Sequence, residues 1–460
     1  MERMSKPGGL LEALTFMFIS SQAGEAGHNC PIACSAGIIR VLQKINDFPH
    51  KDLYLQKLIA PSFTDNFTGA QFLTEIQGGS DVGRNATIAF QDDQKQWRIR
   101  GEKWFCSNAN ADLILMTARF DESMSGTKGL GLYLIPAILS NGERNSYIFR
   151  RLKDKIGTRS MASAEIDFHD AYAIAMGLPE QGFKMVMENV LHISRLFNTF
   201  CMLAMARRAY FIAYNYARHR IAFDQAIIHY PLIKENLARI KSESNAMLAA
   251  IFATVQLQDE FDMGQKQGDQ VKLLLRLLAN LNKYQSAVWS VEHIHHSLDV
   301  LAGNGAIESF SIIPRLFRDS IVCENWEGTH NTLRMQILKD ILKYEIDQIF
   351  INYIEETLSL IANDDDQKQQ IKLVLAKLSV KLTEFRSAND DLQSLQIKDI
   401  VDLMAMILCA TQLLREAIEQ YEKGSDSKLN CLKYFLLIHF NDNAIQLNQD
   451  YIDLITNIIK

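Results

Sequence analysis

The segment Trp97-Arg-Ile-Arg-Gly-Glu-Lys-Trp-Phe-Cys-Ser-Asn108 most constrains the architecture of this 460-residue chain. Apolar and polar side chains alternate at its start, a pattern that predicts a strand with one buried face. Similar short pieces, broken by glycine and polar clusters, recur through residues 68–175 and predict a small β-domain of the sandwich or barrel type. These further pieces are Thr87-Ile-Ala-Phe90, Leu113-Ile-Leu-Met116 and Leu132-Tyr-Leu-Ile135.

Helical periodicity dominates the rest of the chain, so we expect an α+β multidomain fold. The helical runs are 9–46, 183–218, 231–259, 268–301 and 332–359. Four parts are predicted: a truncated N-terminal helical domain (1–67), a middle β-domain (68–178), a C-terminal helical bundle (179–350) and a helical extension (351–460). The extension is expected to begin near Asp364–Asp366 and to have breaks around Ala388–Asp391 and Gly424–Asp426.

Composition indicates a soluble globular protein, with 48% hydrophobic residues and a net charge of -6. Seven scattered cysteines without CxxC spacing argue against a disulfide framework or a zinc site and favour the cytoplasm. The apolar run Leu10–Ile19 is too short to span a bilayer, so no membrane association is expected. Residues 351–460 hold 17 acidic and 11 basic residues, a balance that disfavours a DNA-binding surface.

The segment Leu73-Thr-Glu-Ile-Gln-Gly-Gly-Ser-Asp-Val82 could bind a ligand. Thr74 and Ser80 supply hydroxyl donors, and Gly78 with Gly79 would let backbone amides approach closely. A simple turn between two strands explains the same residues. In the same way, the aromatic residues beside Ser107 could stack along a flat ring, or they could belong to a strand with a buried tryptophan.

The segment Asn325-Trp-Glu-Gly-Thr-His-Asn331 sets one carboxylate between bulky neighbours and a glycine. Partial desolvation raises the pKa of a carboxyl group, which would suit Glu327 to remove a weakly acidic proton. A surface glutamate before a turn glycine is the simpler interpretation when this segment is taken alone.

Together these segments resemble the acyl-CoA dehydrogenase family over most of residues 70–345. The family carries a Thr-Glu-x-x-x-Gly-Ser-Asp loop, a Gly-x-Lys-x-(aromatic)-x-(Thr/Ser)-Asn strand and an (aromatic)-Glu-Gly-(Thr/Ser) turn, in this order. An Arg-x-x-Phe helix end and a Gly-rich turn lie between the last two. The chain matches these two with Arg220-Ile-Ala-Phe223 and Ala302-Gly-Asn-Gly305.

Further segments resemble the alkylation-response, AidB-like branch of this family, which also has a helical C-terminal extension. These segments are Gln77-Gly-Gly-Ser-Asp-Val82, Lys103-Trp-Phe-Cys-Ser107, Arg151-Leu-Lys-Asp-Lys-Ile-Gly157, Pro314-Arg-Leu-Phe-Arg318 and Trp326-Glu-Gly328.

The resemblance implies FAD, and no GxGxxG sequence after a strand suggests a Rossmann fold instead. Thr74 and Ser80 would bond the flavin and its phosphates, and Phe105 with Ser107 would line the ring. Arg220 and Phe223 would reach the FAD of a neighbouring subunit, which implies a homotetramer or at least a dimer. The implied cofactor-binding set is Leu73, Thr74, Gly79, Ser80, Phe105, Cys106, Ser107, Arg220, Phe223, Gly303, Trp326, Thr329 and Asn331.

The implied reaction removes the α-proton of a bound acyl-CoA with Glu327 and passes the β-hydride to flavin N5. In the family, the backbone N–H of the base and a ribityl hydroxyl polarise the thioester carbonyl. Ser80, Arg195 and Gly328 are the implied substrate-binding residues. Some relatives place the base just before Arg195, but Ser194 at this position cannot serve.

The chain departs from the family pattern in three respects. Only about seventy residues precede the β-domain, so part of the helical wall over the acyl chain is expected to be missing. Asp299 and Pro231 replace glutamines that usually touch FAD. The AidB-like branch is also not known chiefly for efficient fatty-acid oxidation.

Other residues receive simpler interpretations. His293, His295 and His296 on one helix lack a further ligand to complete a metal set, so no metal is predicted. Cys106 and Cys323 are interpreted as packing residues, and Arg207-Arg208 as a solvated helix face.

Three functional hypotheses follow. The first is an FAD-dependent acyl-CoA dehydrogenase with an electron-transferring flavoprotein as its redox partner. The second is an AidB-like flavoprotein of the alkylation or DNA-damage response with weak or no dehydrogenase activity, and the acidic extension counts against its binding DNA. The third is a flavin-binding or interaction protein without catalysis. The sequence leaves the acyl-chain length open.

Overall fold

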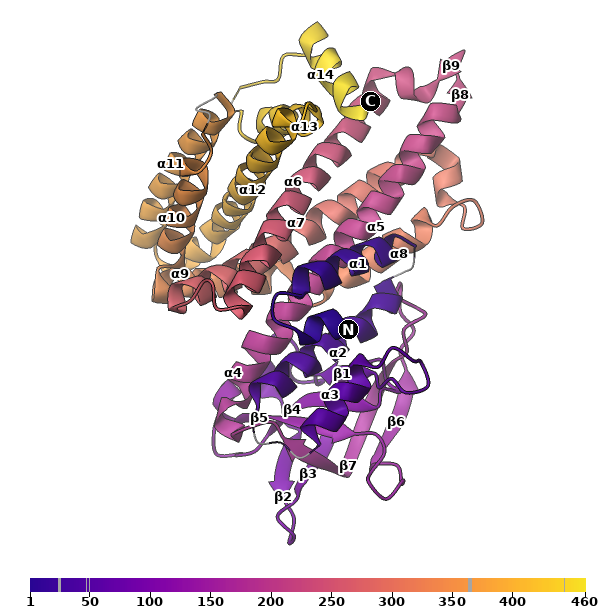
Figure 1. The fold of residues 1–460 in the computed structure, drawn as a ribbon, viewed down its shortest axis with the longest axis vertical. Helices are drawn as coiled ribbons and strands as arrows, with labels where there is room; N and C mark the ends of the chain where they lie inside the picture. The colour runs from indigo at the N-terminus through magenta and orange to yellow at the C-terminus, as the bar shows by residue number, and fades with distance from the viewer. Residues whose placement is uncertain (24–25, 47, 49, 363–365, 442) are drawn as a thin grey trace. The chain divides into compact units, whose positions relative to one another are not determined.

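The computed structural model describes the whole chain except residues 24–25, 47, 49, 363–365 and 442. The described residues form two compact units, Met1–Phe197 and Asn198–Lys460. The predicted α+β class, with a middle β-domain and a helical C-terminal part, is confirmed (Figure 1). No helix among the described residues has both the length and the apolar character that crossing a bilayer requires.

The first unit combines helices with one large sheet. Its helices are α1 (Leu10–Ala23), α2 (Ala26–Lys44), α3 (Lys51–Ile59) and α4 (Gly182–Met185). Its strands are β1 (Gly69–Phe72), β2 (Ile88–Gln91), β3 (Trp97–Ser107), β4 (Leu113–Arg119), β5 (Leu130–Pro136), β6 (Tyr147–Leu152) and β7 (Ser163–Ala175). Helix α5 (His192–His219) begins in this unit and ends in the second.

The sheet closes on itself in the manner of a barrel. Its strand order is β1-β4-β2-β3-β7-β5, and β4 also pairs with β5. The path from β4 through β2, β3, β7 and β5 therefore returns to β4. The register of β4 and β5 runs antiparallel from Leu113 opposite Pro136 to Arg119 opposite Leu130.

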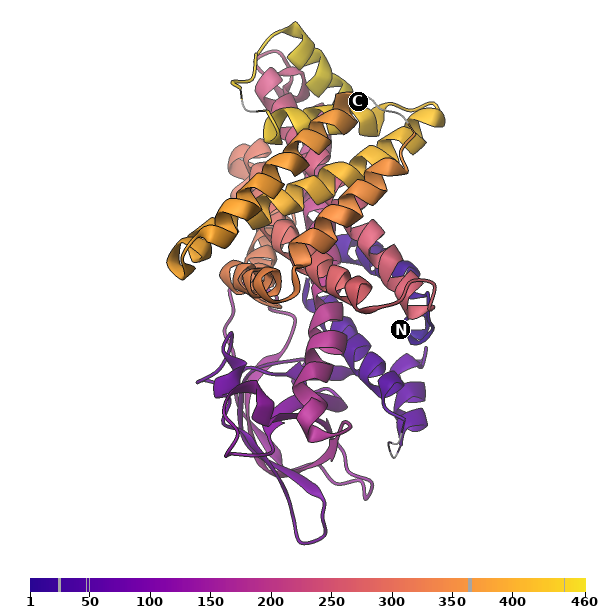
Figure 2. The ribbon, with the colours of Figure 1, turned by 90° about the vertical axis from the view of Figure 1, so that its left-hand side faces the viewer.

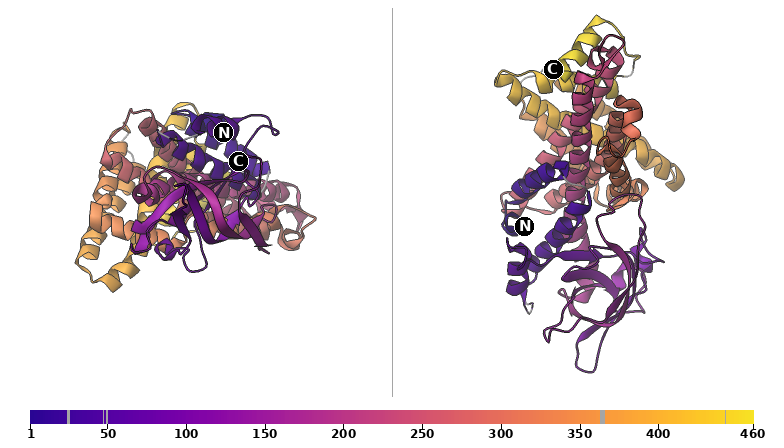
Figure 3. Two further views of the ribbon diagram at one scale, coloured as in Figure 1. Left: turned by 90° about the horizontal axis from the view of Figure 1, so that it is seen from below. Right: turned by 90° about the vertical axis from the view of Figure 1, so that its right-hand side faces the viewer.

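The prediction of alternating burial was wrong for β4, because all four residues of Leu113–Met116 are buried. Ile114 and Met116 face the core enclosed by the strands. Leu113 and Leu115 belong to a second apolar cluster, which includes residues of α2. A strand that is covered on both faces needs apolar residues throughout. Figure 3 (right) shows the N-terminal helices beside the strands.

The second unit is a bundle of long helices. They are α6 (Pro231–Asp262), α7 (Asp269–Val300), α8 (Ile313–Asn325), α9 (His330–Tyr344), α10 (Ile346–Ser359), α11 (Asp366–Ser387), α12 (Asp390–Glu422), α13 (Ser427–His439) and α14 (Gln449–Ile459). A hairpin of β8 (Ile221–Ala222) and β9 (Gln225–Ala226) lies between α5 and α6. Helices α12, α13 and α14 of the extension pack directly on α6, and Figure 2 shows the extension in orange to yellow.

The predicted run 332–359 consists of two helices. Glu345 adopts a left-handed conformation with φ 52° and ends α9, and α10 starts at the next residue. Ile341 and Ile346 are both buried, so the apolar pattern continues through the break and hides it in the sequence.

The two predicted breaks in the extension are confirmed. Helix α12 starts after Asn389, whose side chain accepts a hydrogen bond from Leu392 N at 3.0 Å and caps the helix. Helix α13 starts after Asp426. Of the predicted boundary residues, Asp364 and Asp365 lie outside the described residues, and Asp366 begins α11.

Candidate functional site

The loop after β1, which carries the first predicted motif, is anchored to strand β3. The Trp104 N–H donates to the Thr74 carbonyl at 2.9 Å. Lys103 Nζ donates to Glu75 Oε1 at 2.6 Å and to Leu73 O at 3.3 Å. Both side chains of the Lys103–Glu75 pair have 0% exposure. Separating the pair would leave each charge buried without a partner, which is costly. The pair therefore fixes the loop that presents Thr74 to strand β3.

The second carboxylate oxygen of Glu75 binds a different part of the unit. Oε2 accepts hydrogen bonds from Ala86 N at 2.6 Å and Thr87 N at 3.0 Å. Burial lowers the pKa of the Lys103 ammonium, although the Glu75 carboxylate acts in the opposite direction. Both residues lie inside the motifs, but the sequence alone predicts no function for them. Their structural role is visible only in the folded chain.

The two glycines of the loop have different requirements. A Cβ at Gly78 would lie 2.1 Å from Asn85 Oδ1, so internal packing demands glycine there. A Cβ at Gly79 would meet Thr74 Cγ2 at an ordinary 3.5 Å. The prediction of close ligand approach therefore applies to Gly79, which is exposed together with Ser80, whereas Gly78 packs inside the loop.

Strand β3 presents an aromatic face beside this loop. Phe105 is 53% exposed, while the Cys106 side chain is buried in the core of the strands. Ser107 Oγ lies 3.1 Å from Ser163 Oγ. Lys153 Nζ lies 3.4 Å from the centroid of the Trp104 ring. An exposed ring with a nearby hydroxyl suits one face of a flat conjugated ligand, so these residues fit the flavin that the resemblance implies.

Cys106 requires a distinction between side chain and backbone. Burial raises the pKa of its thiol, and the side chain packs among apolar residues. Any contact from Cys106 to a cofactor would therefore come from its main chain, in agreement with its interpretation as a packing cysteine.

The third motif forms the turn between α8 and α9. Its backbone is left-handed at two successive residues, with φ 59° at Glu327 and φ 108° at Gly328. Such a conformation costs a non-glycine residue about 1–3 kcal/mol. The Glu327 side chain is half-buried, and its Oε2 atom is buried. A strained backbone that presents a partly desolvated carboxylate is typical of a functional position.

Lys283 of α7 holds this turn. Its Nζ donates to Gly328 O at 2.6 Å and to Glu324 O at 2.9 Å, on the two sides of Glu327. The residue is fully buried, with 0% exposure. Lys283 is not predicted from the sequence, because it lies on another helix, outside every motif. The one available signal was a lysine within a stretch of α7 that is otherwise rich in leucine and alanine.

A series of hydrogen bonds connects Asn331, in the first turn of α9, to the extension. Arg334 donates to Asn331 Oδ1 at 3.0 Å and to the Tyr284 hydroxyl. The Tyr284 hydroxyl donates to Asp402 Oδ1 of α12 at 2.5 Å. Burial, followed by the Asp402 carboxylate, raises the pKa of the Tyr284 phenol. Asn331, which the resemblance implies for the nucleotide, is therefore linked to the extension.

The β8–β9 hairpin carries another implied pair, Arg220 and Phe223. Phe223 is 90% exposed at the hairpin tip, with φ 51°. The Tyr230 hydroxyl donates to the carbonyls of Ala222 and Phe223 at 2.9 and 2.8 Å and fixes the tip. An ordered tip with an exposed aromatic ring is available for contact with another molecule.

The Gly-rich turn Ala302–Ala306 repeats the contrast seen at the first loop. A Cβ at Gly305 would lie 2.2 Å from Leu298 O, so packing requires this glycine. A Cβ at Gly303 would meet no atom within 4 Å. Gly303 is thus the position that leaves the backbone open to approach, as the resemblance implies.

The remaining predicted residues differ in exposure. Arg195 is 6% exposed on α5, and Ser194 beside it contacts Gln71 Oε1 at 3.4 Å. Trp326 is half-buried, and Thr329 is exposed with its Oγ1 3.0 Å from Thr332 Oγ1.

The structure groups the predicted residues in two sets. One set belongs to the first unit: Leu73, Thr74, Gly79, Ser80, Phe105, Cys106, Ser107 and Arg195. The other belongs to the second unit: Arg220, Phe223, Gly303, Trp326, Glu327, Gly328, Thr329 and Asn331.

Two family models match the chain. Residues 70–171 match the acyl-CoA dehydrogenase middle domain, and residues 180–342 match the acyl-CoA dehydrogenase C-terminal domain. Together, the two matches cover the motifs described above.

Known proteins with similar sequences agree with these models. Acyl-CoA dehydrogenase family member 11 of Caenorhabditis elegans is 29% identical over 352 residues, which are 75% of this chain and 56% of the relative. Putative acyl-CoA dehydrogenase AidB of Escherichia coli is 28% identical over 347 residues, 73% of this chain and 61% of the relative. The chain thus spans less than two thirds of the length of either relative.

A solved structure extends the similarity to the fold. It is ACDH-11 of Caenorhabditis elegans in complex with C11-CoA, with a TM-score of 0.86 and 25% identity over 95% of this chain and 75% of that one. From its motifs, domain matches and fold, the chain belongs to the acyl-CoA dehydrogenase family.

Proposed function

We propose that the protein is an FAD-dependent oxidoreductase that acts on the CH–CH bond of an acyl-CoA, with Glu327 as the catalytic base. The observation that carries this proposal is the Trp326–Gly328 turn. It presents a half-buried carboxylate on a strained backbone, and a fully buried lysine holds the carbonyls around it. A surface glutamate before a turn would not need this buried support.

Each unit by itself offers residues whose chemistry suits FAD. Thr74, Ser80 and Ser107 offer hydroxyl groups, Phe105 offers an exposed ring, and Gly303 leaves its backbone open. When bound, FAD would supply the acceptor for the hydride that leaves the β-carbon of the substrate.

The chain's own residues would prepare and carry out the proton transfer. Glu327 would take the α-proton. Partial burial of its carboxylate excludes water from this group, which favours the proton transfer. The Glu327 N–H would help polarise the thioester carbonyl as charge develops on its oxygen. Lys283 would keep the turn in its left-handed conformation, so that the carboxylate does not have to reorganise during the reaction.

A homotetramer and an electron-transferring flavoprotein are the proposed partners. The exposed Phe223 on a fixed hairpin supports a contact with a second copy of the chain. ACDH-11, the relative in the C11-CoA complex, supports testing chains of medium length first.

The test is anaerobic reduction of the flavin by a panel of acyl-CoA thioesters from short to long. We expect one or more thioesters to bleach the yellow colour of the purified holoprotein. Glu327→Gln should slow this bleaching by about 10²–10⁴-fold, because general base catalysis contributes this much, while FAD content stays unchanged.

Glu345→Gln provides a matched control. Glu345 also has a left-handed backbone, with φ 52°, and it lies in an exposed turn between two helices. In the Glu345→Gln variant, the thioester should reduce the flavin at the wild-type rate. If FAD binds but no thioester bleaches it, the dehydrogenase assignment fails and the AidB-like alternative, a flavoprotein of the alkylation response, is favoured.

A further inference from the structure

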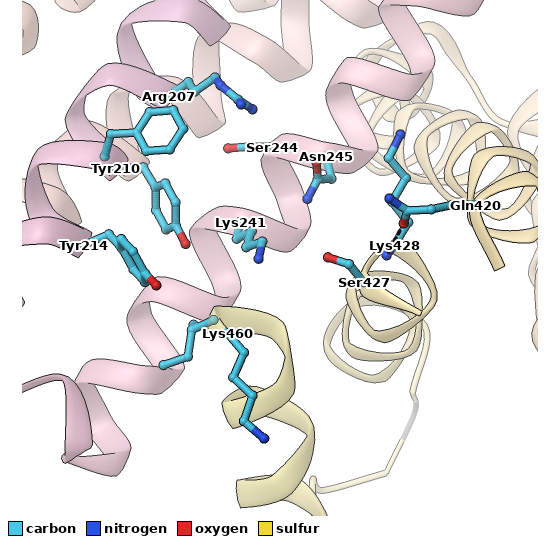
Figure 4. Close-up of a pocket in the computed structure, with 12 residues that line it drawn as sticks. Arg207, Tyr210, Tyr214, Lys241, Ser244, Asn245, Gln420, Ser427, Lys428 and Lys460 are labelled. Carbon is cyan, nitrogen blue, oxygen red and sulfur yellow. Dashed lines mark hydrogen bonds between the residues drawn. The ribbon is translucent and has the colours of Figure 1, made fainter. Parts of the chain in front are cut away.

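A cavity of about 330 Å³ lies within the second unit, among helices α5, α6, α13 and α14 and the end of α12. None of its lining residues belongs to the motifs described above. Figure 4 shows its side chains. It is lined by Arg207, Tyr210, Phe211, Tyr214, Lys241, Ser244, Asn245, Gln420, Ser427, Lys428, Ile459 and Lys460.

The charge of this cavity is one-sided. Four of the twelve lining residues are basic, and none is acidic. Lys428 pairs with Glu416 beside the cavity, and Lys241 Nζ donates to the carbonyl of Ile458. The lining therefore retains an excess of positive charge, which attracts anions.

Arg207 gives the strongest indication of a ligand. Its guanidinium is half-buried, and within the described residues it makes no hydrogen bond or ion pair. Burial lowers the pKa of this guanidinium, because no carboxylate compensates the lost hydration. Its Cζ lies 4.9 Å from the centroid of the Phe211 ring. An arginine fork with unused donors at a cavity wall matches a phosphate.

This position corrects the sequence-based interpretation of Arg207-Arg208 as a solvated helix face. Arg208 is exposed as expected, but Arg207 faces the cavity. Ser244 lies in the lining together with Arg207, and its hydroxyl is 3.3 Å from His293 Nδ1 (Figure 4).

The cavity also offers an aromatic surface. The rings of Tyr210 and Tyr214 are stacked, with centroids 5.9 Å apart and planes at 23°. Ser244, Asn245 and Ser427 add uncharged polar groups to the lining. A flat base could lie against tyrosine, while its phosphate reaches the arginine. The volume also falls in the range of small-molecule sites, about 300–1,000 Å³.

We propose that this cavity binds a nucleoside phosphate, with Arg207 as the phosphate ligand and Tyr210 or Tyr214 against the base. The site is separate from the proposed dehydrogenase motifs and does not depend on that reaction. Its location among α5, α6 and the extension gives the extension a ligand-binding role.

The test is calorimetric titration of the FAD-saturated protein with AMP, ADP, adenosine and inorganic phosphate. Saturation with FAD prevents the probes from entering an empty flavin site. We expect AMP or ADP to bind with one-to-one stoichiometry and more tightly than either adenosine or inorganic phosphate. Arg207→Gln should raise the Kd at least tenfold, and the exposed neighbour Arg208→Gln should leave it unchanged.

Ser427→Asp is a second variant in case Arg207→Gln does not fold. It adds a carboxylate to the cavity wall at the first turn of α13, where a negative charge favours the helix. It should also weaken nucleotide binding at least tenfold. The proposal is overturned if no nucleotide binds, if adenosine or inorganic phosphate binds as tightly as AMP and ADP, or if the Arg207 and Arg208 variants behave alike.

Discussion

Two motif turns in this molecule are each supported by a buried lysine, but the lysines come from different places in the sequence. Lys103 supports the Thr74–Ser80 loop from inside the neighbouring motif and pairs with Glu75, which belongs to the loop itself. Lys283 supports the Glu327 turn from a helix that carries no motif, through the carbonyls of Glu324 and Gly328.

The difference shows what a motif records. In the β-domain, Glu75 belongs to the candidate loop after β1 and its partner Lys103 lies on β3, so the two neighbouring motifs contain both the loop and its support. In the helical unit, the support comes from α7 and, through Tyr284 and Asp402, from the extension. The motif around Glu327 therefore contains the candidate base but not the residues that support its turn. Variants of the supporting residues can test whether this contrast is also one of stability.

The largest effect on stability is expected for Lys103, whose charge is buried and paired with Glu75. Lys103→Met should lower the free energy of unfolding by about 3–5 kcal/mol, because it leaves the Glu75 carboxylate buried without its cation. Urea denaturation followed by tryptophan fluorescence measures this change. The exposed Lys128→Met should stay within about 0.5 kcal/mol of the wild type. Equal effects of the two variants would show that the pair does not anchor the loop.

Glu243 is a second buried carboxylate, and its partners come from helices that are distant in the sequence. Glu243 of α6 has 0% side-chain exposure and contacts His293 of α7 at 2.6 Å, His439 of α13 at 3.0 Å and Arg239 at 3.1 Å. Burial alone would raise the pKa of Glu243, but the two imidazole hydrogen bonds and the Arg239 charge outweigh it and hold this pKa well below its ordinary value of 4.5.

A carboxyl group with a depressed pKa in the folded state stabilises the fold above its unfolded pKa. This stabilisation is lost as pH falls below about 4.5 towards the folded pKa. Glu243→Gln should cost about 3 kcal/mol at pH 7 and should flatten the acid limb of a plot of stability against pH. An unchanged acid limb would mean that Glu243 does not contribute to acid unfolding.

The smallest effect on stability is expected at the Glu327 turn. Lys283→Met should cost about 2 kcal/mol, because hydrogen bonds from a charged donor contribute about 1.5–3 kcal/mol. Flavin reduction should slow by about tenfold as the turn loses its geometry. Stopped-flow absorbance and urea denaturation measure the two effects. Lys283→Arg should recover part of the rate, and the exposed Lys272→Met on the same helix should match the wild type.

Loss of stability without loss of rate in Lys283→Met would make this lysine a folding residue only. Loss of rate with full FAD content would instead support its role in positioning Glu327.

The residues of the candidate site could be found from local sequence because each motif is short and contiguous. Gly79 and Gly303 illustrate the limit of that approach. Gly79 follows Gly78 directly, and Gly303 lies two residues before Gly305. Only packing distinguishes the open position from the one that the fold requires. The closeness of Gly78 to Asn85 and of Gly305 to Leu298 depends on tertiary contacts that no pattern of neighbours specifies.

The sequence by itself determined the helical and β regions, the family and the identity of the candidate base, because periodicity and contiguous motifs are local properties of the chain. Only the tertiary structure decided that β4 is covered on both faces, that Lys283 holds the Glu327 turn, and that Arg207 lines a cavity. These features arise between residues far apart in the chain, where burial changes the energy of a charge or a strand face.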